Sequence, residues 1–316
     1  MREVLAVGEC MLELRHMPGS GEADLLRLGY AGDTYNTAVY ARRVADLLGV
    51  DAEVGFLTGV GSDEYSAGMR SAWAAERVRD RSVLVEGHLP GLYTVRVDGS
   101  GERRFGYWRS ESAARALFAG TDWVAGVGGD VIHLSGITLQ IASEPARAAL
   151  LDRIAALRAS GSRVSLDTNY RAAGWPGRAE AAKVMDQFCQ SADIVLATWD
   201  DESALHGCGT LAQAADRLAA LGPAEVVVKD GPAGAHVLTG GRFEHVPAAR
   251  AESVTDTTAA GDSFAGGYLA ARLAGRDPVA AAAVAAQVAA VVVAHPGAIV
   301  PAGTPLLTEA QLREAR

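Results

Sequence analysis

The sequence predicts an α/β protein, with a three-layer α/β/α domain, a mostly parallel sheet and a small β-sheet lid. Short apolar strand patterns alternate with helix patterns along most of the 316 residues, which is typical of parallel sheets covered by helices on both faces. One hairpin pattern interrupts this alternation and predicts the lid. The length suits a single domain over residues 1–316, with the lid formed from about 10–30 and 82–110.

Composition narrows the classes of partner. The net charge of −9 and the pI of about 5.3 argue against nucleic acid, whose phosphates favour a basic surface. The N-terminal apolar run is too short for a signal peptide, and the stretch 279–294 is mostly alanine and contains Gln287, which predicts a buried helix rather than a membrane span. Three cysteines, an odd number, suit a reducing cytoplasm. We expect a cytoplasmic homo-oligomer, a dimer or higher, that binds neither nucleic acid nor membrane.

The first elements place two polar side chains beside a turn. Residues 4–7 predict a buried strand, and Gly32-Asp33 predicts a turn before a helix over 34–49. Asp33 and Asn36 lie one turn apart at this helix start, so both could face a polyol. Capping of the helix by Asp33 is the other interpretation.

The hairpin that interrupts the alternation is interpreted as a lid that covers the substrate and excludes water. Tyr107 and Arg109 share one strand face because side chains alternate with a period of two, and Tyr93 lies on the opposing strand. A solvated hairpin with aromatic cross-strand pairs is the other interpretation. The strand patterns lie at 82–85, 93–97 and 103–108, with an Asp-Gly-Ser-Gly turn at 98–101.

Two segments in the middle of the chain predict buried strands that each lead into a polar or turn-forming segment. Residues 131–137 predict a strand followed by a turn, and His133 within it is interpreted as a core histidine rather than a ligand. Residues 164–167 predict a parallel strand, and ligands bind at the carboxyl ends of such strands in open α/β sheets. Arg171 lies just beyond this end, where it could pair with an anionic substrate or with a transferring phosphate.

A further strand pattern at 225–229 ends at Lys229, and a terminal hairpin follows over 237–246. Between them, Gly231 and Gly234 predict a turn that could lie under a nucleotide. A strand-to-strand turn with an exposed lysine is the other interpretation.

The stretch 254–267 carries the strongest indication of chemistry. Residues 259–261, Ala-Ala-Gly, are too small to hide the backbone, and the spacing of Phe264 and Tyr268 predicts that a helix follows. At a helix N-terminus the free N–H groups and the positive end of the dipole favour an anion. Asp262 lies in the first turn, where its carboxylate could accept a proton from a hydroxyl nucleophile while the N–H groups hold a phosphoryl group. An ordinary helix start with small residues for close packing is the other interpretation.

This stretch and the order of the earlier motifs resemble the ribokinase-like (phosphofructokinase-B-type) carbohydrate kinases. Their C-terminal signature is Asp-Thr-x-Gly-Ala-Gly-Asp, and here Ala259 replaces the first glycine. By this resemblance Asp262 is the general base, and Ala259, Ala260 and Gly261 provide the amides of the anion hole. The form Gly-Asp-Thr-x-Asn-Thr at 32–37 is typical of the family's 2-keto-3-deoxygluconate kinases. The implied activity is ATP-dependent phosphorylation of that acid sugar to its 6-phosphate.

The same resemblance implies further site residues. Mg²⁺ would accompany ATP and be positioned through water by Glu202, although Trp199 stands where many members carry asparagine. A monovalent cation such as K⁺ often binds near the loop 295–301 in this family. The sugar would contact Gly32, Asp33, Asn36, Tyr93, Tyr107, Arg109, Ile137, Arg171 and Asp262, and the nucleotide would contact Asn169, Lys229, Gly231, Gly234, Ala259, Ala260 and Gly261.

Other classes of function are weighed against this resemblance. The sequence has no Walker-type phosphate loop, no Gly-x-Gly-x-x-Gly after a strand and no zinc motif, which argues against a Walker NTPase, a dinucleotide enzyme and a zinc enzyme. Three alternatives stay open: a kinase for another keto-deoxy acid or for a neutral sugar such as fructose or ribose, a Gly-Asp-Ser esterase, and a non-catalytic sugar-binding protein. For the esterase, Asp130 and His133 lie upstream of Ser263, which is the wrong order. The presence of Asp262 counts against a protein without catalysis.

Overall fold

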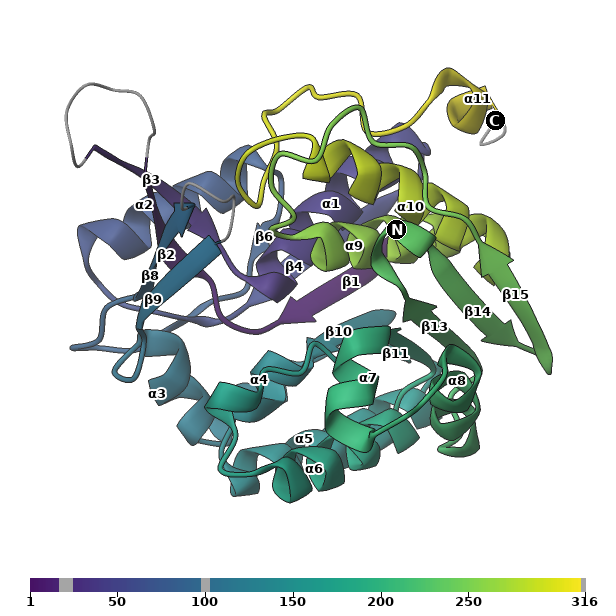
Figure 1. The fold of residues 1–316 in the computed structure, drawn as a ribbon. Coiled ribbons are helices and arrows are strands. Elements are labelled where there is room, and N and C mark those ends of the chain that lie inside the picture. The colour runs from purple at the N-terminus through teal and green to yellow at the C-terminus, as the bar shows by residue number, and fades with distance from the viewer. Residues whose placement is uncertain (17–24, 98–102, 314–316) are drawn as a thin grey trace.

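The computed structural model describes residues 1–16, 25–97 and 103–313, and its core is a three-layer α/β/α arrangement (Figure 1). Neighbouring strands of the central sheet pair in parallel except at one edge, where the last two strands add in antiparallel pairs, so the predicted mostly parallel sheet is confirmed. The sheet has the strand order β15 (Arg242–Val246), β14 (Ala235–Thr239), β13 (Glu225–Lys229), β12 (Ile194–Thr198), β11 (Arg163–Asp167), β10 (Val131–Ser135), β1 (Arg2–Val7), β4 (Ala52–Leu57) and β6 (Arg79–Asp80).

Two layers of helices cover the sheet, because its strands present apolar side chains to both faces. In β1, Val4 and Ala6 pack into one core cluster and Leu5 and Val7 into the other. One layer contains α1 (Asp33–Leu47), α2 (Glu64–Ala75), α9 (Ala260–Leu273) and α10 (Pro278–Val293). The other contains α3 (Ala113–Ala119), α4 (Gly136–Ile141), α5 (Glu144–Ala159), α6 (Arg178–Gln190), α7 (Trp199–His206) and α8 (Leu211–Ala220).

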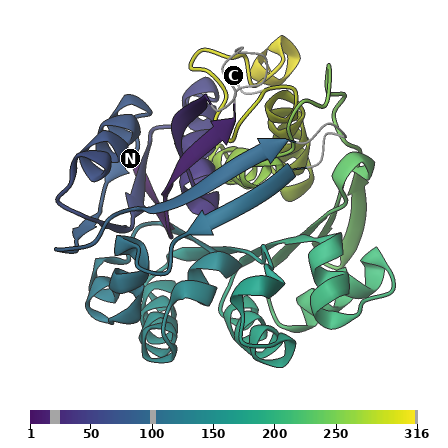
Figure 2. The same cartoon turned by 60° about the vertical axis from the view of Figure 1, so that its left-hand side comes forward.

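A separate four-stranded sheet forms the predicted lid strands, in the order β3 (Leu26–Ala31), β2 (Met11–His16), β8 (Gly91–Val97) and β9 (Arg103–Trp108). Figure 2 shows its strands crossing in front of the main domain. The strand predicted at 82–85 is not part of it, since β7 (Val83–Leu84) pairs with β5 (Gly59–Val60) instead. The turn predicted at 98–101 lies outside the described residues.

Most of the observed helix and strand boundaries lie within two residues of the predicted ones. One segment has a different secondary structure from the one predicted. The turn expected after β10 is a helix, α4, whose start is capped by Ser135, which accepts a hydrogen bond from the Ile137 N–H at 3.2 Å. Glycine at position 136 lets this helix approach β11, because a Cβ there would lie 2.0 Å from the Thr168 carbonyl oxygen. His133 is a buried core residue with Nδ1 3.2 Å from Ser165 Oγ, as predicted.

The alanine-rich stretch predicted as a buried helix is α10, which packs against α9. No helix within the described residues has the length and apolar character needed to cross a membrane. Two short elements complete the chain: the 3₁₀ turn Gly231–Ala233 after β13 and α11 (Glu309–Arg313) near the C-terminus. Two further 3₁₀ turns span Asp122–Gly126 and Ala172–Gly174.

Candidate active site

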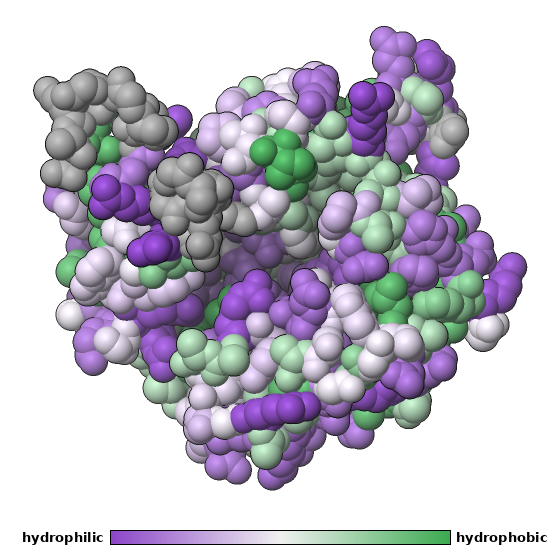
Figure 3. Space-filling view, in the orientation of Figure 1, coloured by the Kyte–Doolittle hydropathy of each residue, from purple (hydrophilic) through white to green (hydrophobic). Residues whose placement is uncertain are grey.

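A cavity of about 670 Å³ opens between the lid sheet and the carboxyl ends of β1, β11, β12 and β13. Figure 3 shows the hollow at the centre of this face, with hydrophilic residues around it. This is the place where open α/β sheets bind ligands. Its lining contains Glu9, Met11, Gly32, Asp33, Asn36, Tyr93, Phe105, Tyr107, Arg109, Ile137, Asp167, Asn169, Arg171, Thr198, Asp200, Asp201, Lys229, Thr257, Thr258, Ala259, Ala260, Gly261 and Asp262.

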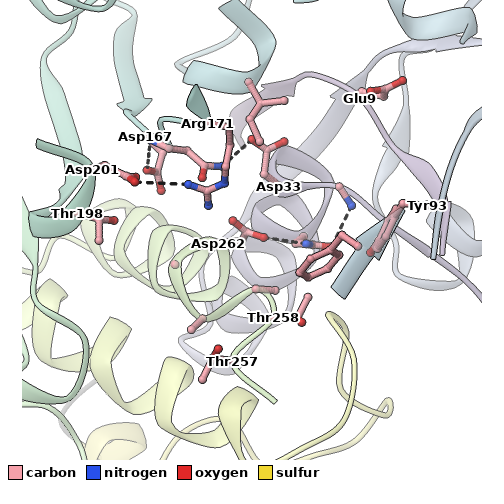
Figure 4. Close-up of a pocket in the computed structure, with 18 of the residues that line it drawn as sticks. Glu9, Asp33, Tyr93, Asp167, Arg171, Thr198, Asp201, Thr257, Thr258 and Asp262 are labelled. Atoms are coloured by element: carbon pink, nitrogen blue, oxygen red, sulfur yellow. Dashed lines mark hydrogen bonds and ion pairs between the residues drawn. The ribbon is translucent and has the colours of Figure 1, made fainter. Parts of the chain in front are cut away.

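Asp262 lies in the first turn of α9 and faces this cavity (Figure 4). Its Oδ2 accepts a hydrogen bond of 2.8 Å from Asn36 Nδ2 on α1. Burial, and secondarily the negative charge of Asp33, raises the pKa of Asp262 to about 7. A carboxyl group with that pKa can take up a proton near neutral pH, which is what a general base requires.

The start of α9 has the geometry of an anion site. Ala259 precedes the helix with φ of 60°, so the alanine that replaces the family glycine adopts the left-handed conformation that glycine favours. The Ala260 N–H donates to the Thr257 carbonyl at 3.2 Å. Within the described residues, the N–H groups of Gly261 and Asp262 have no backbone acceptor, as is usual in a first helical turn. Of the three amides that the resemblance implied, those of Ala259 and Gly261 have no backbone acceptor within the described residues, and that of Ala260 donates to Thr257.

A polar cluster lies across the cavity from α9. Asp33 Oδ1 accepts from the Thr34 N–H at 2.9 Å, and its Oδ2 accepts from Asn169 Nδ2 at 2.9 Å and from the Ser135 hydroxyl. Asp33 does not cap α1: the residue before this helix is Gly32, and it makes no side-chain capping bond. Asn169, which the resemblance implied at the nucleotide, lines the cavity and donates to Asp33.

Two arginines line the cavity, and each contacts a carboxylate. Arg109 Nη2 forms an ion pair with Glu9 Oε2, and Arg171 Nη1 lies 3.5 Å from Asp201 Oδ1. Figure 4 shows Arg171 with Asp167 and Asp201 on one side of the cavity and Glu9 on the other. Sequence reasoning did not find Glu9. The available signal was a charged residue directly after the carboxyl end of a parallel strand.

The lid contributes aromatic side chains. Tyr93 and Tyr107 face each other across β8 and β9 with ring centroids 5.9 Å apart, and Phe105 packs beside both. The aromatic cross-strand pairing considered for this hairpin is therefore present, and the same rings line the cavity. The Tyr93 hydroxyl donates to Glu13 Oε2 at 2.5 Å, so this phenol already has a buried partner.

Lys229 lies at the end of β13 with its Nζ 2.7 Å from Asp167 Oδ2. It is buried, so the interpretation as an exposed lysine is wrong. A Cβ placed on Gly261 would lie 3.5 Å from this Nζ, which puts the ammonium beside the start of α9. Gly231 and Gly234 are absent from the lining of this cavity.

Glu202, the residue implied for Mg²⁺, is not among the residues that line the cavity. Its side chain is fully buried, and Oε2 accepts from Arg217 Nη2 at 2.6 Å. The neighbouring Asp200 and Asp201 line the cavity instead. In the part of the chain that the structure describes, no three His, Cys, Asp or Glu side chains form a ready-made metal cage.

Ser263, the candidate esterase nucleophile, is fully buried, and its hydroxyl donates to the Ala260 carbonyl at 3.0 Å. It does not line the cavity. A nucleophile must reach the substrate, so this arrangement gives the esterase alternative no support.

Comparison with known proteins agrees with this geometry. A sequence profile described as the pfkB family carbohydrate kinases matches residues 1–305. The chain is 39% identical over 310 residues to a 2-dehydro-3-deoxygluconokinase of Escherichia coli (strain K12), a match that covers 95% of this chain and 97% of that protein. Two solved structures share the fold at 23% identity. One is aminoimidazole riboside kinase from Salmonella enterica, complexed with aminoimidazole riboside and an ATP analogue (TM-score 0.80, 99% of each chain). The other is fructokinase with bound ATP from Xylella fastidiosa (TM-score 0.76, 94% of this chain and 93% of that one).

Proposed function

Because the chain belongs to the pfkB family of carbohydrate kinases, we propose that it transfers the γ-phosphoryl group of ATP to 2-keto-3-deoxygluconate and forms the 6-phosphate. The observation that carries this proposal is the convergence of Asp262, Arg109 and Arg171 on one cavity. The carboxylate can serve as a base at a helix N-terminus, and guanidinium groups suit the carboxylate of an acid sugar. The similar E. coli enzyme is named for the same sugar, also called 2-dehydro-3-deoxygluconate.

The proposed reaction uses three features of this site. Asp262 takes the proton from the sugar hydroxyl, whose oxygen forms a bond to the γ-phosphorus while the bond to the β–γ bridging oxygen breaks and ADP leaves. The N–H groups at the start of α9 hold the charge that develops on the phosphoryl oxygens. The polar cluster around Asp33 and Asn36 orients the sugar, because a reacting hydroxyl must lie close to Asp262 and in line with the leaving group.

The charge of the cavity supports a need for Mg²⁺ with ATP. Six carboxyl side chains and three basic side chains line it, so an anionic nucleotide would be repelled without a divalent cation. When bound, Mg²⁺ supplies neutralisation of the phosphate charge. We propose contacts from Asp200 and Asp201, since Glu202 is committed to Arg217. Titration of activity with Mg²⁺ tests this: Asp201→Asn should shift half-saturation, and Glu202→Gln should not.

A monovalent cation near the loop 295–301 is a further part of the proposal. The Gly297 N–H donates to Asp256 Oδ2 at 2.9 Å, and Asp256 Oδ1 accepts from the Thr258 N–H at 2.9 Å. Asp256 thereby links this loop to the segment before α9, so a cation bound there would act on the anion site. Activity in potassium chloride should exceed activity in tetramethylammonium chloride at equal ionic strength.

We also propose that the chain is a cytoplasmic homo-oligomer. The lid region exposes apolar side chains, including Leu28, Leu89 and Trp108, and large exposed apolar groups on a sheet favour association. The three cysteines are free thiols, namely Cys10, Cys189 and Cys208. Free thiols are typical of proteins in the reducing cytoplasm, which supports the proposed location. In analytical ultracentrifugation, the Trp108→Glu variant should sediment as a smaller assembly than the wild type.

Phosphorylation of a neutral sugar is the second candidate, and one observation favours it. Both cavity arginines already contact carboxylates of the protein, Glu9 and Asp201. Neither guanidinium therefore requires a substrate carboxylate to balance its charge. A coupled assay of ADP release over a panel of 2-keto-3-deoxy acids and neutral hexoses separates the two. Higher kcat/KM for the acids supports our proposal, and higher kcat/KM for fructose or ribose replaces it with the neutral-sugar function.

A further inference from the structure

Glu9 is buried at the edge of the candidate sugar site. It follows the carboxyl end of β1, and its side chain is 1% exposed. Oε1 accepts a hydrogen bond from the Ser112 hydroxyl, and Oε2 forms the ion pair with Arg109. The lid leaves room for this arrangement at Gly91, where a Cβ would lie 2.9 Å from Glu9 Oε1 and 3.2 Å from Arg109 Cβ.

We propose that Glu9 is the positioning residue of Arg109 and thereby sets the preference of this enzyme for anionic over neutral sugars. The inference rests on the proposed function, in which Arg109 binds the substrate carboxylate. Glu9 would act through Arg109 rather than on the sugar itself.

The guanidinium of Arg109 has donors left for a ligand. Nε and Nη2 are buried, and Nη2 is in ion-pair contact with Glu9, so within the described residues Nη1 is the nitrogen left for a ligand that enters the cavity. Guanidinium groups have five N–H donors in a rigid fork, so one carboxylate does not exhaust them. The side chain is 17% exposed and lines the cavity, where an entering carboxylate can reach it.

A contribution to stability does not by itself explain the buried ion pair between Glu9 and Arg109. A buried ion pair often stabilises a protein no better than apolar side chains of the same size, because both charges lose their hydration. It does fix the direction of the charged groups. Without Glu9, the nearby carboxylate of Asp33, which the charge of Arg109 already influences, becomes the next partner for the guanidinium. Arg109 would then turn toward the polyol site and away from the position that suits a substrate carboxylate.

The first test is Glu9→Gln, which keeps the shape and the acceptor for Ser112 but removes the charge. We expect KM for the 2-keto-3-deoxy acid to rise about tenfold and kcat to change much less, with a smaller rise of KM for a neutral hexose. A KM for the acid that falls would overturn the inference, because Glu9 would then act as a competing anion. Glu9→Asp, one methylene shorter, serves as the second variant if Glu9→Gln is unstable, with the same expected direction.

The decisive measurement is a double-mutant cycle with Arg109→Ala. If Glu9 acts through Arg109, adding Glu9→Gln to Arg109→Ala should change KM for the acid less than twofold. Effects that multiply instead would overturn the positioning role while leaving carboxylate recognition by Arg109 intact. If Arg109→Ala itself leaves the preference for acids unchanged, both this inference and the recognition of acid sugars by Arg109 fail.

Glu225→Gln is the matched control. Glu225 is also buried, and its Oε1 lies 2.6 Å from Arg272 Nη2, but neither residue lines the cavity. This variant should lower the melting temperature without changing the ratio of the KM values for acid and neutral sugars. A change in that ratio would show that loss of any buried ion pair alters selectivity, and the inference would be withdrawn.

Discussion

Asn36 Nδ2 on α1 donates a hydrogen bond of 2.8 Å to Oδ2 of Asp262 on α9, although the two residues are 226 positions apart. The Thr37 hydroxyl adds a bond of 3.2 Å to the Asp262 backbone carbonyl. Both contacts join the two helices at the cavity and fix the direction of the carboxylate. Since Asn36 occupies Oδ2, Oδ1 is the oxygen left to receive a proton from a sugar hydroxyl.

Asp262→Asn should abolish turnover while ATP and sugar binding stay within about tenfold of wild type. The amide keeps the shape and can still accept from Asn36, but it cannot take the proton. The measurements are steady-state kcat and the two dissociation constants by calorimetry. Turnover above about a tenth of the wild-type value would rule out Asp262 as the base. Ser263→Ala is the control, and it should be nearly silent because this hydroxyl is buried on the Ala260 carbonyl.

The raised pKa of Asp262 predicts a pH dependence of activity. Its ionised form is the base, and its pKa is about 7, so kcat/KM should rise as pH increases through about 7 and level off above it. The measurement is the pH profile at subsaturating sugar with saturating ATP. A profile that is flat between pH 5.5 and 8.5 would contradict the assignment.

The same shift predicts the sign of a stability effect. A carboxyl group whose pKa is raised by folding favours the folded state at low pH, and this contribution is lost as pH rises through the folded pKa of about 7. Asp262→Asn removes the cost of a buried charge, so urea unfolding should show the variant gaining stability relative to wild type between pH 5 and pH 8.

The lid interpretation predicts protection on sugar binding. Tyr93 and Tyr107 line the cavity from the lid strands, so a bound sugar should reduce hydrogen exchange in residues 91–97 and 103–109. The edge strand β15, residues 242–246, does not line this cavity, so its exchange provides an internal control. Equal exchange with and without saturating sugar would remove the lid function.

Much of the fold could be predicted because strand and helix patterns are local. The start of α9 could also be predicted, since small residues before a helix pattern indicate its N-terminus, and the anion site there stays a prediction. Glu9 could not be assigned, because the role we propose for it depends on Arg109, which lies one hundred residues later in the chain and just after a strand of the lid sheet. The same limit applies to Glu202, whose side chain is bound to Arg217 rather than turned toward the cavity.

Ala259→Gly should stabilise the protein by up to about 1.6 kcal/mol. Alanine in the left-handed conformation costs roughly 1–2 kcal/mol, and the greater freedom of glycine in the unfolded chain offsets about 0.4–1 kcal/mol of the gain. Urea unfolding measures the difference. Ala260→Gly, at a right-handed helical position, should instead destabilise by up to about 1 kcal/mol. Equal loss of stability in both variants would show that the strain at Ala259 is not real.

Charge recognition gives the sharpest prediction about the substrate. A hydrogen bond to a carboxylate from a charged donor contributes about 1.5–3 kcal/mol, so losing one should raise KM for the acid sugar roughly 10- to 150-fold. Arg109 is 17% exposed and Arg171 is 57% exposed, and solvent weakens the more exposed interaction. We therefore expect Arg109→Ala to lie near the upper end of that range and Arg171→Ala near the lower end.

Neutral hexoses separate the possible roles of these arginines. A contact with the sugar carboxylate raises KM for acids alone, whereas a contact with the transferring phosphate lowers kcat for every substrate. Arg171 lies next to Asp201, near the acids we propose for Mg²⁺, so its kcat is the more informative of the two. If neither Arg109→Ala nor Arg171→Ala changes the preference for acids over neutral hexoses, the acid-sugar assignment has no physical basis in this cavity. The generic sugar-kinase function would then replace it.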